Sequence, residues 1–239
     1  MPSATQRTKL WDLPVRVIHW SFVALLPLLW WTAENGKMDL HMTLGQVMLG
    51  LVTFRVLWGV IGSSTARFAS FVRGPLTVIS YLRRLAKGDG ETVAGHNPAG
   101  GWSVVLLLAL LALDLGLGLI AQNVDGVTGP LNYLVSYDQA EQATEWHELV
   151  FNIILALVVL HIAAILFYTF IKKDRLVPPM ITGSKDLPAA MAAPTMAPAW
   201  RIIPCLLIAL ALAWWIAKGA PTSLEQLNAP PPMDASEYM

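Results

Sequence analysis

The sequence predicts an all-α integral membrane protein, and two observations support this. Of the 239 residues, 55% are hydrophobic and only 13% are charged, whereas about 25% of a typical soluble domain is charged. Five apolar stretches also approach or exceed the roughly 20 residues with which a helix crosses a bilayer. Backbone polar groups in lipid must be hydrogen-bonded within their own segment, so we expect each stretch to be a helix.

The five expected helices follow one another along the chain. They lie at about residues 15–33, 41–62, 102–122, 147–170 and 201–217. The N-terminal segment lacks a small-residue cleavage site, so we expect the first helix to be retained and not removed as a signal peptide. The last helix is short, but Arg201 and Lys218 flank it and two tryptophans lie near its end, which is typical of helix ends at a membrane surface.

The connecting segments and the overall charge exclude several classes of protein. The longest loop, at about residues 63–101, contains an expected short helix at about 76–87, and residues 187–200 form a connector rich in Pro and Ala. A formal net charge of zero predicts no nucleic-acid partner. The single Cys205 excludes an intrachain disulfide and a cysteine-rich metal site, and the sequence contains no nucleotide-binding or hydrolase motif.

The distribution of Lys and Arg predicts the orientation of the chain. The chain has 16 Lys and Arg residues. If the N-terminus is cytoplasmic, all of them except Lys37, Lys218 and the intramembrane Arg55 fall on the cytoplasmic side, as the positive-inside rule requires. The C-terminus then lies in the periplasm. The periplasmic side is acidic, either because it simply lacks basic residues or because it docks a soluble partner with a basic patch.

Four of the five histidines lie in or at the ends of the expected spans, and they pair by depth. With the N-terminus in the cytoplasm, His19 lies near the inner end of the first span, whereas His41 and His147 lie at the outer ends of the second and fourth. His161 follows His147 by four turns, which is about 21 Å along the helix on nearly the same face. We therefore expect an inner pair, His19 with His161, and an outer pair, His41 with His147.

Two pairs of imidazoles at two depths predict two stacked haems. A haem takes an axial ligand on each face, for which neutral imidazole is a standard ligand, and facing helices of a bundle can supply one each. Two imidazoles leave the iron no open position, so it would carry single electrons. The alternatives are hydrogen bonds between helices, or an outer metal site in which Glu145 and Glu148 join His147.

Three charged residues in or near the membrane are further candidates. Arg55 lies 14 residues after His41 and thus at the depth of the inner pair, where it needs an anion. A haem propionate would serve, because Arg binds carboxylates through a planar fork; the alternatives are an ion pair with Asp114 or Asp12, or a side chain that reaches the inner surface. Arg16 is a second propionate candidate, or it marks the membrane edge. Asp114 is either protonated, paired with Arg55, or a proton donor to a quinone.

Several motifs resemble those of a known family. The segment WDLPVRVIHW at residues 11–20, the GHNP segment at 95–98, and His41, His147 and His161 with their neighbours resemble bacterial cytochrome b561 and the b-type cytochrome subunits of nickel–iron hydrogenases. The resemblance covers about residues 9–185. It implies a four-helix transmembrane bundle that holds two haem b groups, with His19, His41, His147 and His161 as axial ligands to the iron.

The resemblance also implies an organisation of the chain. Residues 1–186 would form the dihaem cytochrome b domain of four helices. The connector at 187–200, the additional transmembrane helix at 201–218 and a periplasmic tail at 219–239 depart from that pattern. His96, in the GHNP segment, is a candidate contact of a propionate or a quinone head group, or it belongs to a helix-start turn with Asn97 as the cap and Pro98 at the first helical position.

The expected function is electron transfer in a bacterial inner membrane. The resemblance implies an electron-transfer subunit of a quinone-linked oxidoreductase, which passes electrons between the quinone pool and a periplasmic c-type cytochrome or hydrogenase-like subunit. Assembly with itself or with other subunits stays open. The alternatives are a proton-coupled membrane transporter and a membrane anchor without a cofactor.

Overall fold

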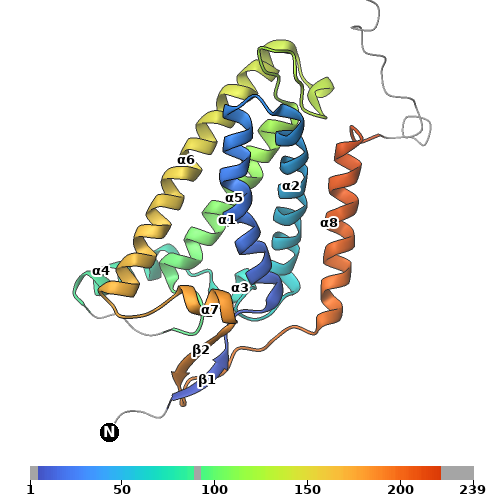
Figure 1. The fold of residues 1–239 in the computed structure, drawn as a ribbon. Coiled ribbons are helices and arrows are strands. Elements are labelled where there is room, and N and C mark those ends of the chain that lie inside the picture. The colour runs from blue at the N-terminus through green and yellow to red at the C-terminus, as the bar shows by residue number, and fades with distance from the viewer. Residues whose placement is uncertain (1–4, 89–92, 222–239) are drawn as a thin grey trace, which may run out of the picture.

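Five long helices run side by side in the computed structural model, which describes residues 5–88 and 93–221 (Figure 1). They are α1 (Leu13–Glu34), α2 (Met38–Ile61), α5 (Pro98–Ile120), α6 (Tyr137–Phe170) and α8 (Ile202–Ala217). Within the described residues, these five helices, with the last counted from Ala199, are long and apolar enough to cross a membrane. The predicted spans are therefore confirmed, with small shifts at most of their ends.

Helix caps account for the earlier starts of three helices. Asp12 caps α1 and Asn97 caps α5, each by accepting a hydrogen bond from the backbone N–H three residues further on. At the start of α6, Ser136 and Gln139 form a capping box, in which each side chain bonds the other's backbone N–H. With this cap, α6 begins ten residues before its predicted start. The prediction missed these residues because a polar helical turn outside lipid carries no hydropathy signal.

The helices pack in pairs that α2 connects. The α1 helix packs on α2, α5 packs on α6, and α2 contacts α5 and α8. Apolar side chains from several helices form two buried clusters, one around Trp58 and Phe54 and one around Met48 and Ile154. The α6 helix has 34 residues, which is about 51 Å of helix and exceeds the roughly 30 Å hydrocarbon core of a bilayer.

The last helix, α8, lies against α2 (Figure 1). A methyl group added at Gly50 of α2 would lie 3.8 Å from Cβ of Ala213 in α8, and Ala209 of α8 is buried. Small residues allow membrane helices to approach closely, so α8 docks on the apolar flank of α2.

Short elements gather at the end of the molecule where α1 begins (Figure 1). These are strands β1 (Thr5–Lys9) and β2 (Ser184–Pro188) and helices α3 (Phe68–Phe71), α4 (Pro75–Ala86) and α7 (Val177–Thr182). The α4 helix matches the short helix expected in the long loop. The antiparallel pairing of β1 with β2 was not predicted, since two short polar segments far apart in sequence carry no local signal for it.

Two 3-10 turns complete the described chain, at Asn132–Leu134 and Ala199–Arg201. The predicted connector at 187–200 therefore begins inside strand β2 and ends in a helical turn. Most of the predicted tail at 219–239, from residue 222 onward, lies outside the described residues.

Candidate functional site

The side chains of His41 and His147 face each other near the end of the bundle that carries the 121–136 loop. His41 lies in the first turn of α2, and His147 lies in α6. Their ring centres are 6.2 Å apart, and the ring planes are almost perpendicular, at 89°. Two residues more than 100 positions apart thus place their imidazoles at one level.

Both rings are held at Nδ1 by backbone carbonyls. Nδ1 of His41 lies 3.0 Å from the carbonyl oxygen of Leu29 and 3.3 Å from the Thr32 hydroxyl. Nδ1 of His147 lies 2.9 Å from the carbonyl oxygen of Asp114. Because a carbonyl only accepts hydrogen bonds, Nδ1 donates in both rings and the lone pair of Nε2 is left to bind another group.

Asp114 contacts His147 through its side chain as well as its backbone. A carboxylate oxygen of this buried residue lies 3.1 Å from Nδ1 of His147. The partner of Asp114 in the structure is thus this histidine and not Arg55, which was one of the expected alternatives. Carboxylates and carbonyls that accept from the second nitrogen of an imidazole are the usual support of a metal-binding histidine.

The two rings line a cavity of about 490 Å³ between α1, α2, α5 and α6. Two glycines shape it. A methyl group at Gly118 would lie 3.1 Å from Cε1 of His147, whereas one at Gly45 would meet no atom within 4 Å. Gly118 therefore allows the ring of His147 to approach α5, and Gly45 leaves open space beside His41.

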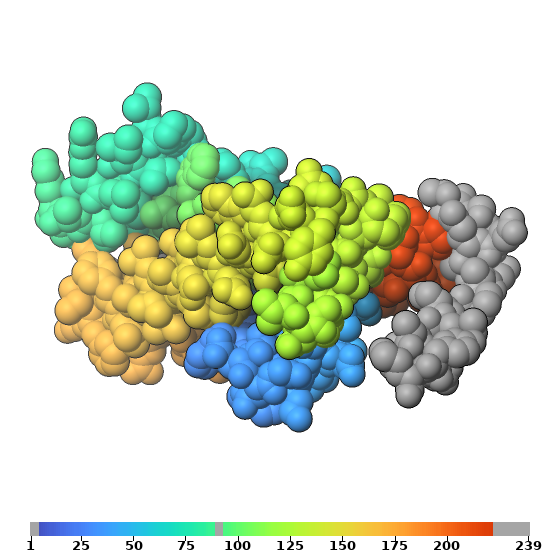
Figure 2. All heavy atoms as spheres, turned by 90° about the horizontal axis from the view of Figure 1, so that it is seen from above, coloured from blue at the N-terminus to red at the C-terminus, as the bar shows by residue number. Residues whose placement is uncertain are grey.

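The loop at 121–136 covers this end of the cavity. The backbone N–H of Leu131 donates to the carbonyl of Leu119 at 2.8 Å, and the amide of Asn132 donates to the carbonyl of Ile120 at 3.0 Å. These bonds fold the loop back on the end of α5, so that Pro130 lines the cavity. Figure 2, seen from above, shows the loop and the first turns of α6 on this face.

The spacing of His41 and His147 fits a metal between them. A metal bound by both imidazoles lies about 2 Å from each bound nitrogen, and each ring centre lies about 1 Å behind that nitrogen, so the ring centres would be about 6 Å apart. The observed distance between the ring centres is 6.2 Å. Among the described residues, no group of three or more His, Cys, Asp and Glu side chains is arranged to hold a metal ion. The alternative of a site made by His147 with Glu145 and Glu148 is therefore not supported, and the pair suits a metal whose other ligands come from a cofactor.

The other predicted pair consists of His19, which lies on α1, and His161, which lies on α6. Within the described part of the chain these two rings make no direct contact with each other, in contrast to those of His41 and His147, and the uninterrupted helix from His147 to His161 separates the two levels by about 21 Å. Nδ1 of His19 is buried without a hydrogen-bond partner among the described residues, while the ring of Trp20 stands edge-on to the imidazole at 5.2 Å. The α6 helix thus contributes one histidine to each pair.

Arg55 is buried in α2, with 6% of its surface exposed. Its guanidinium donates one long hydrogen bond, 3.4 Å, to the carbonyl of Ala66 and lies over the ring of Phe68, 5.3 Å from its centre. No ion pair of Arg55 occurs within residues 5–88 and 93–221. Asp12, the other ion-pair partner expected from the sequence, acts on the guanidinium electrostatically but does not approach it closely enough to form an ion pair. A buried guanidinium with five donors and one long bond is suited to an anion.

His96 lies outside the spans, against the rings of two aromatic residues. Its ring centre is 4.7 Å from that of Trp11 and 4.5 Å from that of Phe71. Burial, together with the nearby Arg55, lowers the pKa of His96 to about 3, so the ring is neutral at physiological pH. Its Nδ1 has no hydrogen-bond partner among the described residues. The helix-start turn also forms, since the next residue caps α5.

Arg16 is directed toward the segment that follows α6. Its guanidinium donates to the carbonyl of Ile181 in α7, and it lies against Gly183, where a methyl group would be 2.8 Å from Nη1. Its Nε is buried without a partner among the described residues. Arg16 therefore fixes the segment after α7 to the first turn of α1.

Sequence reasoning missed the groups that orient the histidines. Thr32 and the carbonyl of Leu29 hold His41, and Asp114 holds His147. A threonine and an aspartate inside apolar spans were the available signals, since a polar group in lipid needs a partner. The identity of each partner depends on how the helices are rotated, which hydropathy does not encode.

The chain was compared with known proteins. A family model described as prokaryotic cytochrome b561 matches residues 10–183. Comparisons with curated proteins and with solved structures gave no match.

Proposed function

The chain belongs to the prokaryotic cytochrome b561 family, and from this premise we propose that it holds two haem b groups and passes electrons between the quinone pool and a periplasmic redox partner. The family binds haem b, and the chain is a multi-pass membrane cytochrome of electron transfer. The number of haems, their ligands, the quinone and the partner are the proposal.

The observation that carries the proposal is the facing pair of His41 and His147. Both imidazoles are oriented by backbone carbonyls, each leaves Nε2 to bind, and they line a cavity of about 490 Å³ with 6.2 Å between ring centres. Haem b supplies a one-electron iron couple when it is bound by two imidazoles. We propose His41 and His147 as the ligands of one haem, and His19 and His161 as those of the other.

The residues around the first pair hold and tune the ligands. The carbonyls of Leu29 and Asp114 fix the Nδ1–H tautomer, so each ring presents the nitrogen that binds a metal. The Asp114 carboxylate adds negative charge next to His147, which favours the more positive, oxidised state of a bound metal.

The residues around the second pair provide positive charge and donors. Arg55 is buried and within electrostatic range of His96, which is in turn within range of His161. We propose that Arg55 binds a haem propionate through its guanidinium, with Arg16 as a second contact, since both keep donors that no described residue takes up. His96 is proposed as a neutral partner of the same propionate or of a quinone head group.

The orientation follows from the positive-inside rule. We propose a cytoplasmic N-terminus, so that the pair of His19 and His161 lies toward the cytoplasm and the pair of His41 and His147 toward the periplasm. The first turns of α6 then project from the periplasmic side and carry the exposed acidic residues Asp138, Glu141 and Glu145. A c-type cytochrome or hydrogenase-like subunit with a basic patch would suit this face.

Haem counting on single-histidine variants tests the proposal. His147→Leu and His161→Leu should each retain about one haem per chain, because each removes one ligand from a different pair. Val159→Leu is the matched control on the same helix and should retain two, since Val159 is 66% exposed and has no proposed role at either haem. Loss of both haems in each ligand variant, or two haems in all of them, would contradict the pairing.

A further inference from the structure

Helix α4 is an amphipathic helix attached to the end of the bundle where α6 ends. Its buried face carries Tyr81, whose hydroxyl is hydrogen-bonded to that of Tyr168 in α6. The amide of Asn97, at the start of α5, donates to the same Tyr168 hydroxyl at 3.1 Å. These bonds fix α4 (Pro75–Ala86) at the level of the last turn of α6.

The level of α4 is that of a membrane surface. Its two neighbours, α5 and α6, begin and end here, at Pro98 and Phe170. Trp102, in the first turns of α5, is 43% exposed, and its indole N–H donates to the carbonyl of Arg73 just before α4 at 2.7 Å. Exposed tryptophans are enriched where apolar and polar regions of a membrane meet, so α4 lies at that boundary.

The face of α4 directed away from the bundle combines apolar and basic side chains. Leu76, Ile79 and Leu82 are 80%, 45% and 48% exposed. Basic residues follow them in the last turns, at Arg83, Arg84 and Lys87. A helix with an exposed apolar stripe and a basic end is typical of helices that lie in the membrane interface.

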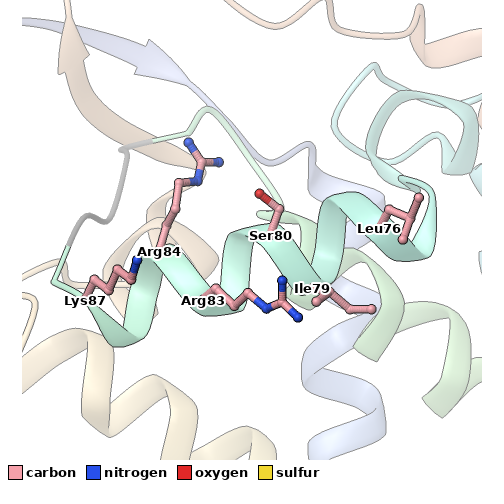
Figure 3. Close-up of a pocket in the computed structure, with 6 residues that line it drawn as sticks. All are labelled: Leu76, Ile79, Ser80, Arg83, Arg84 and Lys87. Carbon is pink, nitrogen blue, oxygen red and sulfur yellow. The ribbon is translucent and has the colours of Figure 1, made fainter.

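All of these side chains except Leu82, together with Ser80, line one shallow hollow along the helix (Figure 3). It has a volume of about 290 Å³, and its lining consists of Leu76, Ile79, Ser80, Arg83, Arg84 and Lys87. Within the described part of the chain, neither Arg83 nor Lys87 forms an ion pair. The hollow therefore offers apolar contacts from Leu76 and Ile79, the hydroxyl of Ser80, and the positive charges of Arg83 and Lys87.

We propose that this hollow binds an anionic phospholipid of the surrounding leaflet. The phosphate lies between Arg83 and Lys87 and accepts a hydrogen bond from Ser80, and an acyl chain runs along Leu76 and Ile79. Basic residues at the membrane surface attract anionic lipids by about 1 kcal/mol each, and buried acyl carbons add to the binding. A zwitterionic headgroup lacks the net negative charge that the basic end requires.

Lipid titration of the purified full-length protein tests this. The delipidated protein in detergent is titrated with phosphatidylglycerol and, separately, with phosphatidylcholine, and bound lipid is counted by native mass spectrometry. The double variant R83Q/K87Q should weaken phosphatidylglycerol binding about thirtyfold. The matched control R7Q/K9Q removes two exposed charges from β1 at the same end of the molecule and should change it less than twofold.

A second variant and a competitor separate a lipid from a free phosphate. Leu76→Gln keeps every charge and should weaken phosphatidylglycerol binding severalfold, because it removes only the acyl contact. Inorganic phosphate at millimolar concentration should not displace the lipid. The proposal would be overturned if both lipids bound equally, or if R83Q/K87Q and R7Q/K9Q lost the same amount of phosphatidylglycerol affinity. Displacement of the lipid by inorganic phosphate would also overturn it. Helix content measured by circular dichroism confirms that each variant is folded.

Discussion

Replacement of Asp114 with Asn should raise the reduction potential of the haem that we propose is held by His41 and His147. A carboxylate oxygen of Asp114 lies 3.1 Å from Nδ1 of His147, and an imidazole ring with one metal–nitrogen bond adds about 4 Å, so the charge acts over about 7 Å. At an effective dielectric constant of about 20, this contributes about 2.4 kcal/mol, or about 100 mV for a one-electron couple. Negative charge stabilises the oxidised metal, so its removal raises the potential.

A redox titration followed by haem absorbance measures this shift. The proposed second centre would lie about 21 Å along α6, where the same charge contributes about one third as much. We therefore expect one haem to shift by about 100 mV and the other by about 35 mV. The control Glu145→Gln removes a charge from an exposed position of α6, where water screens it, and should shift both haems much less. Equal shifts of the two haems in D114N, or a fall in potential, would refute the reasoning.

Three further predictions concern other parts of the site and fold. Arg55→Gln should lower the potential of the second centre, because it removes a buried positive charge; the same titration checks it, and an unchanged potential would argue against a role beside the haem. Gly118→Val should reduce the haem content to about one per chain, because even a methyl group there would lie 3.1 Å from the ring of His147; two bound haems would show that the ring need not stay in place. Asp12→Ala should destabilise the protein by about 1–2 kcal/mol, because it removes the α1 cap and the acceptor of the Trp58 indole N–H, at 2.9 Å; thermal unfolding in detergent measures this, and an unchanged midpoint contradicts it.

Hydropathy predicted the helices well because lipid imposes one simple requirement on them. Each of the five expected spans is a helix, since an apolar stretch of this length must satisfy its backbone internally. The polar start of α6, from Tyr137 to Trp146, was missed because most of its residues are polar and hydropathy does not detect them. This part of the helix depends on the Ser136 cap instead. The pairing of β1 with β2 was missed because it joins segments almost 180 residues apart.

The sequence predicted the level of His41 and His147 in the membrane but not which residues surround them. Their positions at the outer ends of two spans placed His41 and His147 at one level, and their ring centres lie 6.2 Å apart. The level alone leaves open the rotation of each helix about its axis. For this reason the sequence offered Arg55 as a partner of Asp114, whereas the structure places the carboxylate beside His147 and Arg55 near Ala66 and Phe68.

The haem content of the purified, unaltered protein tests the central claim most directly. The account predicts two low-spin haem b groups per chain, with the absorbance of iron bound by two imidazoles, after expression with ample haem supply. A colourless protein, or a single haem with an open coordination position that binds carbon monoxide, would contradict it.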